Sequence, residues 1–175
     1  LNDVPIGKDG NSNKVIKKVG EIPNFEFNPL SHYEIGKKLN LMDFDMASKV
    51  SGSRFVFLRG SLALLERAIS NFMLDIHIKE FGYEEISPPL IVSDTTMFGT
   101  GQLPKFEKDQ FEIKLDSESG RKFLIPTAEV VLTNFVRESF LKKEQLPLRL
   151  VASTACFRKE AGSYGKDTKG MIRQH

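Results

Sequence analysis

The chain has 175 residues, of which 40% are hydrophobic, and this is enough to bury one substantial core, so we expect a single domain. Its 25 basic and 23 acidic residues leave a net charge of +2, which excludes the evenly basic surface of a histone-like or ribosomal protein. The single cysteine, Cys156, excludes an internal disulfide and suits a reducing cytoplasm, while no apolar run approaches the roughly 20 residues of a membrane span.

The two ends have the composition of parts of a longer sequence. Residues 1–20 are polar and rich in turn-forming residues, which favours a connector from an upstream segment. The last residues, 170–175, begin a strand without a stop signal, and we therefore expect a fragment. After the connector, the pattern indicates a short extended piece at 25–29 and a helix of one or two turns at 32–39.

The clearest helix is predicted over 61–81. A strand rich in aromatic and β-branched residues precedes it at 54–60, Ser61 is a suitable N-cap, and Gly82 is a typical C-terminal stop. Apolar side chains recur at spacings that place them on one helical face: Leu62, Leu65, Ile69, Phe72, Met73 and Ile76. A strand follows at 83–92, and its two prolines place it at an edge or an interface, because each proline removes a ladder donor.

The rest of the chain predicts a hairpin, a helix and a further strand. The expected elements are a loop at 93–107, hairpin strands at 110–115 and 122–125, a helix at 128–141 capped by Thr127, and a strand at 148–157. This order favours an α+β fold with an antiparallel sheet. Neither a GxGxxG nor a GxxxxGK[ST] loop is present, so any nucleotide must be bound in another way.

Charged residues gather at the end of the last predicted strand and beyond it. Arg158 and Glu160 are two residues apart, so in a strand both side chains lie on one face. A glycine-bearing loop follows, and Arg173 lies on the expected returning strand. A guanidinium can hold phosphate oxygens in a bidentate fork, and a nearby carboxylate can accept a hydrogen bond from an adenine amino group. The Arg-x-Glu pattern also occurs in ordinary surface ion pairs.

These residues resemble motif 2 of the class II aminoacyl-tRNA synthetases, and the loop over 160–170 is similar to that of the seryl branch. Four other segments resemble the same family: 50–55 the strand before the dimer helix, 81–89 motif 1, 99–104 the Gly-Thr-Gly stretch, and 125–130 the Thr-x-Glu serine-binding loop. Taken alone, motif 1 is also a plain helix with an edge strand, and Thr127 a plain helix cap. The segments occur in the family's order along the whole chain.

The resemblance implies a class II α+β fold, an antiparallel sheet flanked by helices, incomplete at its C-terminal end. Residues 1–20 would link it to a tRNA-binding coiled-coil arm, and 21–175 would form the N-terminal part of the catalytic domain. Motif 1, at about 61–92, would form a homodimer interface, the serine loop would be 125–130, and motif 2 would span about 150–175. The implied enzyme is a cytoplasmic serine–tRNA ligase that activates L-serine with ATP and transfers it to the 3′ end of tRNA(Ser), although the fragment alone is expected to be inactive.

By the same resemblance, Arg158 is the expected catalytic residue, contacting the α-phosphate and the serine carboxylate. The implied serine-binding residues are Thr127, Ala128, Glu129 and Arg158. The implied ATP-binding residues are Arg158, Lys159, Glu160 and Arg173, with Lys159 pointing away from the nucleotide. No metal ligand is expected within the chain, since the Mg²⁺ ligands and the motif 3 arginine are expected downstream of His175.

Two other functions stay open. One is a non-catalytic protein of the same fold that senses an amino acid or binds RNA, and the other is a ligase that loads an amino acid onto a carrier protein. Several basic residues could contact an RNA acceptor end or could form a solvated surface: Lys105, Lys142, Lys143, Lys166, Lys169 and Arg173.

Overall fold

The computed structural model describes residues 6–53, 55–114 and 120–159. The chain divides into two compact units, Leu1–Leu30 and Ser31–His175. In the first unit, the described residues are all exposed, and their one regular element is the 3-10 turn η1 (Gly10–Ser12), which Asp9 caps through a hydrogen bond from the Asn11 backbone N–H. The apolar side chains of this unit, such as Ile16 and Ile22, are exposed with its other described residues.

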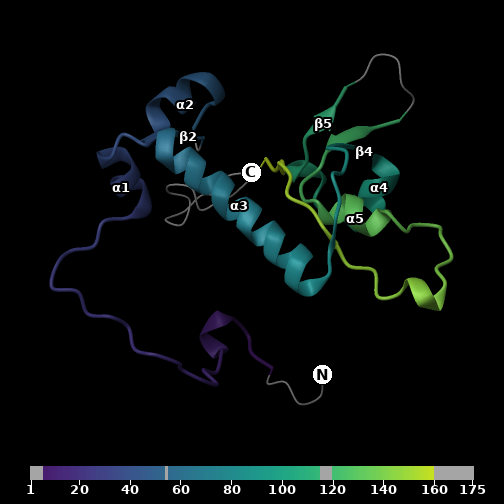
Figure 1. Cartoon of the computed structure of the whole chain (residues 1–175), viewed down its shortest axis with the longest axis horizontal. Helices are drawn as coiled ribbons and strands as arrows, with labels where there is room; N and C mark the ends of the chain where they lie inside the picture. The colour runs from purple at the N-terminus through teal and green to yellow at the C-terminus, as the bar shows by residue number, and fades with distance from the viewer. Residues whose placement is uncertain (1–5, 54, 115–119, 160–175) are drawn as a thin grey trace. The chain divides into compact units, whose positions relative to one another are not determined.

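The second unit begins with two short helices and a two-stranded sheet (Figure 1). The elements are α1 (His32–Lys38), β1 (Met42–Asp43), α2 (Phe44–Ser51) and β2 (Phe57–Leu58), and β1 pairs antiparallel with β2. The helix predicted at 32–39 is confirmed, and a capping box between Ser31 and Glu34 explains where it begins. The sequence interpretation missed α2, and the strand predicted over 54–60 is shorter than expected, because pairing with β1 covers only two residues.

The longest helix of the described residues is α3 (Gly60–Phe81), drawn as the long diagonal ribbon in Figure 1. Its predicted end is confirmed by Gly82, whose φ of 65° is the left-handed conformation that favours glycine at a helix end. Ser61 is not the cap, because the helix already includes it, and Arg59 at the cap position makes no side-chain capping bond. Four apolar side chains of the predicted face remain 48–63% exposed: Leu65, Ile69, Phe72 and Met73.

The strand predicted over 83–92 is two strands in two different sheets. Strand β3 (Glu84–Glu85) pairs in parallel with β7 (Leu150–Val151), whereas β4 (Ile91–Ser93) pairs antiparallel with β6 (Lys122–Leu124). Pro88 and Pro89 separate them, since proline has no N–H to donate to a ladder. The predicted hairpin is confirmed, because β6 also pairs antiparallel with β5 (Glu112–Ile113).

Three further predictions needed correction. Residues 93–107 are not only a loop: they contain α4 (Asp94–Gly99), capped by Ser93, and the start of η2 (Glu107–Asp109). The helix predicted over 128–141 is α5 (Glu129–Asn134), since beyond it the backbone makes only tighter turns, before the 3-10 turn η3 (Lys143–Gln145). The strand predicted over 148–157 is regular only at β7, because pairing with β3 ends at Val151 and no further strand of the described residues pairs with it.

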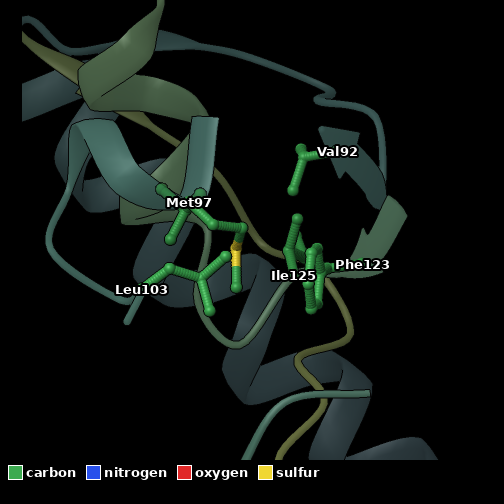
Figure 2. Packing of buried hydrophobic residues seen from close by; sticks show 6 residues of the cluster. Val92, Met97, Leu103, Phe123 and Ile125 are labelled. Atoms are coloured by element: carbon green, nitrogen blue, oxygen red, sulfur yellow. The ribbon is translucent and has the colours of Figure 1, made fainter. Parts of the chain in front are cut away.

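The core lies between the three-stranded sheet and the helices α4 and α5. Its buried side chains come from β4, α4, the loop after it, β6 and α5: Val92, Met97, Leu103, Phe123, Ile125 and Val130. Figure 2 shows five of them facing one another. Asn134 joins the two helices, since its Nδ2 donates to the Thr96 carbonyl at 3.0 Å and to the Val130 carbonyl at 2.8 Å. The predicted α+β class with an antiparallel sheet flanked by helices is confirmed.

None of the described helices combines the length and the hydropathy required to cross a membrane.

Candidate active site

The predicted serine loop lies at the junction between the sheet and α5. Ile125 and Pro126 are buried, Thr127 is half-buried, and Glu129 is exposed at the start of the helix. The Thr127 hydroxyl accepts a hydrogen bond from the Glu129 backbone N–H at 3.3 Å, although Ala128 rather than Thr127 takes the cap position. The loop therefore combines a fixed hydroxyl with an accessible carboxylate.

Arg158 lies directly against this loop. Its Nε donates to the Pro126 carbonyl at 3.0 Å, across 32 residues of sequence. The backbone agrees with that contact, because the Phe157 N–H donates to the Ile125 carbonyl at 2.9 Å. Arg158 is exposed, and its two remaining guanidinium nitrogens make no other hydrogen bond within the described residues.

Lys159, the next residue, contacts a different segment of the chain. Its backbone N–H donates to the Asp109 carbonyl at 2.9 Å, and its Nζ lies 5.6 Å from the centroid of the Phe111 ring. A cation over an aromatic face is attracted by the ring quadrupole. The structure thus brings Arg158 against the loop that carries Thr127, Ala128 and Glu129, whereas Lys159 contacts Asp109 and Phe111.

Two predicted site residues, Glu160 and Arg173, lie outside the described residues, as do Lys166 and Lys169 of the predicted RNA contact. The other lysines of that contact, Lys105, Lys142 and Lys143, are exposed. Of these, Lys105 lies with its Nζ 4.9 Å from the Phe106 ring centroid.

One charged cluster near the site was missed in the sequence analysis. Arg121, at the start of β6, donates from Nε and Nη2 to the two carboxylate oxygens of Glu112 at 2.8 and 2.9 Å, and Nη2 also pairs with Glu107. The hydrogen bond from Arg121 holds the pKa of Glu112 below its ordinary value, and both carboxylates raise the pKa of Arg121. The pair of Arg121 and Glu112 could have been predicted from the sequence, because they are opposite charges on the two strands of the predicted hairpin, at positions that can be diagonal neighbours.

Metal-ligand side chains do not gather in the described part of the chain, where no three histidine, cysteine or acidic residues come close enough to hold an ion. The polar residues of the site can act through hydrogen bonds and charge. Arg158 can bind an anion, Glu129 can pair with a cation, and the Thr127 segment lies between the sheet and the helix that position them.

A family model for the tRNA synthetase class II core domain (G, H, P, S and T) matches residues 110–175. The serine–tRNA ligase of Pelagibacter ubique (strain HTCC1062) is 69% identical over 173 residues, which are 99% of this chain and 41% of that protein. The serine–tRNA ligase of Caldicellulosiruptor saccharolyticus is 57% identical over 174 residues, 98% of this chain and 40% of that protein.

Two solved structures are similar in fold. Seryl-tRNA synthetase from Pyrococcus horikoshii, complexed with ATP, has a TM-score of 0.76 and 39% identity, covering 86% of this chain and 33% of that chain. Cytoplasmic serine-tRNA ligase from Naegleria fowleri, in complex with AMP, has a TM-score of 0.84 and 29% identity, covering 100% of this chain and 41% of that chain. The chain thus spans about two-fifths of the length of the curated relatives it matches.

Proposed function

Because the chain belongs to the seryl branch of the class II aminoacyl-tRNA synthetases, we propose that the protein carrying it activates L-serine with ATP and transfers the seryl group to tRNA(Ser). The observation that carries this proposal is the hydrogen bond from Arg158 Nε to the Pro126 carbonyl. It places a permanent cation beside the Thr127 to Glu129 segment, so one site can bind both a phosphate and an amino acid.

The proposed activation step needs no general base from the protein. The serine carboxylate is already ionised, and one of its oxygens attacks the α-phosphorus of ATP while the bond from that phosphorus to the pyrophosphate oxygen breaks. Negative charge shifts onto the phosphate oxygens during this displacement. A guanidinium fixed through its Nε, with its other nitrogens unbonded within the described residues, can follow that charge without reorganising.

The amino acid is proposed to lie over the start of α5. The exposed carboxylate of Glu129 is placed to pair with the serine ammonium, and the Thr127 segment supplies polar groups beside it. A site that hydrogen-bonds the serine hydroxyl would discriminate against alanine, since its polar groups would be left unpaired. Lys159, Glu160 and Arg173 are proposed to belong to the ATP-binding segment, with Lys159 turned toward Phe111 rather than toward the nucleotide.

The proposal also covers the domain organisation, a homodimer, the cellular location and the metal ion. Residues 1–20 are proposed to link to a tRNA-binding arm, and 21–175 to form the first part of the catalytic domain. The exposed apolar face of α3 supports a homodimer interface, since a soluble protein rarely leaves such a face uncovered. We further propose a cytoplasmic location, and Mg²⁺ bound with ATP and held by ligands downstream of His175, as the family resemblance implies.

Serine-dependent exchange of labelled pyrophosphate into ATP tests the proposal in the full-length gene product. We expect exchange with serine, none with alanine or threonine, and a loss of at least about 100-fold in Arg158→Ala, the order seen when a transition-state charge contact is removed. Arg149→Ala is the matched control, because Arg149 is an exposed arginine of the same segment for which no side-chain contact is found among the described residues.

Exchange that is absent from a folded wild-type protein would contradict the proposal and favour an amino-acid or RNA-binding role. Exchange that survives Arg158→Ala unchanged would contradict the role given to Arg158. Loading of a carrier protein in place of tRNA would leave the activation step intact and change only the acceptor.

A further inference from the structure

Arg121 connects three separate segments of the fold. Its guanidinium pairs with Glu112 of β5 and with Glu107 of η2, and its backbone carbonyl accepts a hydrogen bond from the Asp94 N–H at 3.1 Å, next to β4. The guanidinium also lies 4.9 Å from the centroid of the Phe123 ring, which is buried in the core. The Arg121 side chain therefore adds ion pairs that join segment 107–113 to the sheet that carries Phe123.

Segment 107–113 contacts the chain at Lys159 through two residues, Asp109 and Phe111. The Asp109 carbonyl accepts from the Lys159 backbone N–H, and the Phe111 ring lies beneath the Lys159 ammonium. Between these two residues, Gln110 is only 3% exposed, and its Nε2 donates to the Phe106 carbonyl at 3.1 Å. The segment is attached to the sheet by the β5 pairing and by the Phe111 carbonyl, which accepts from the Leu124 N–H at 3.0 Å. Arg121 adds the ionic contacts to Glu107 and Glu112.

Arg158 lies between two backbone anchors. On one side, the Phe157 N–H bonds to the carbonyl of Ile125, a fully buried core residue. On the other side, the Lys159 N–H bonds to Asp109. The first hydrogen bond is to a core residue. The second is to segment 107–113, which Arg121 contacts through its two ion pairs.

From this arrangement we propose that Arg121 is a positioning residue, which sets the place of the Arg158 guanidinium by holding segment 107–113 against Lys159. The proposal rests on the proposed function, since it gives Arg121 a part in placing the group that binds ATP. Exposed ion pairs add little to stability on their own. Catalysis is far more sensitive to displacement than folding is, because a shift of about 1 Å at a reacting group can cost about 100-fold in rate.

The test uses Arg121→Met in the full-length protein, which keeps much of the side-chain length and removes the charge and the fork. We expect kcat for serine-dependent pyrophosphate exchange to fall roughly tenfold and ATP affinity, measured by calorimetry, to weaken several-fold, with the Tm nearly unchanged. Arg121→Lys should restore activity only in part, because an ammonium cannot hold both carboxylates in a fork. Lys37→Met, which breaks an exposed ion pair with Asp45 away from the site, is the matched control and should change neither quantity.

A second readout separates positioning from a general effect on the fold. In an Arg158→Ala background, Arg121→Met should weaken ATP affinity no further, because the group it positions is absent. The double variant Glu107→Gln with Glu112→Gln leaves Arg121 in place and removes the charges of both partners. It should reduce kcat and ATP affinity in the same direction as Arg121→Met, which tests the inference even if Arg121→Met folds poorly.

The outcomes are distinguishable. If wild type exchanges and Arg121→Met matches it in kcat and ATP affinity, the inference is overturned and the proposed function stands. An equal loss of ATP affinity in the Arg158→Ala background would also overturn the inference, because Arg121 would then act by another route. If the folded wild-type protein shows no exchange, the proposed function fails, and the inference fails with it.

Discussion

Replacing Phe72 on α3 should weaken self-association of the full-length protein more than any other single change on that face. Phe72 is 63% exposed, the largest value among the predicted face residues. An aromatic side chain presents about 150–250 Å², so roughly 100–150 Å² of it is left for a partner to cover. At about 25 cal/mol per Å², covering that area contributes about 3 kcal/mol in each protomer.

In a two-fold dimer, Phe72 of both protomers lies in the interface, so the substitution removes its contribution twice, about 6 kcal/mol in total. Phe72→Ser should therefore raise the dissociation constant by about 10³–10⁴-fold, taking each 1.4 kcal/mol as a factor of about 10 and allowing for partial repacking. Sedimentation velocity over a concentration series measures this constant directly.

The control is Phe98→Ser on α4, because Phe98 is the same residue type with a similar exposed fraction of 54% but lies outside α3. We expect it to leave the dissociation constant unchanged. A Phe72→Ser protein that dissociates as wild type does would refute the reasoning that this face is a dimer interface, as would a wild-type protein that is a monomer at every concentration.

Two further predictions concern the sheet and the helices around the site. Gly99→Ala should lower the free energy of unfolding by about 1–3 kcal/mol in urea titrations, because the new Cβ would lie 2.6 Å from Asn134 Oδ1, and that amide is already held by two backbone carbonyls. Gly10→Ala, with nothing within 4 Å, should have no such cost. Since Arg121 lowers the folded-state pKa of Glu112, the stabilisation by this carboxylate is present above its unfolded pKa and is lost as pH falls through the folded value. Because the pair is exposed, the Tm of Glu112→Gln should be only slightly below that of wild type at pH 7, and this small difference should shrink below about pH 4.3, the ordinary glutamate value. A difference that stays constant down to pH 2 would contradict the ion pair.

Elements that depend on local signals were predicted from the sequence. Helix α3 has a long apolar repeat and a glycine stop, α1 has the Ser31 cap, and the hairpin of β5 and β6 has a turn-rich segment between two apolar runs. Each of these signals acts within a few residues of the element itself. Sequence reasoning could therefore place these elements, although not their final residues.

Elements that depend on distant partners were not predicted. The run 83–92 was expected to form one strand, but β3 pairs with β7 and β4 pairs with β6, so two partners from different parts of the chain divide it. Helix α4 was missed because it has only six residues, and its place in the fold comes from Met97 in the core and from Asn134 of α5. Short elements gain most of their stability from packing, which periodicity does not report.

For the candidate site, the residue types and their order were evident from the sequence: Thr127, Glu129 and Arg158 lie in segments that resemble one family of ligases. Two contacts became evident only in the folded chain: Arg158 reaches the Pro126 carbonyl across 32 residues, and Arg121 joins two carboxylates of the segment that contacts Lys159. Side-chain chemistry is a property of each residue and can therefore be known before the fold. Proximity, in contrast, follows from which backbone groups pair and which apolar side chains pack together once the whole chain has folded.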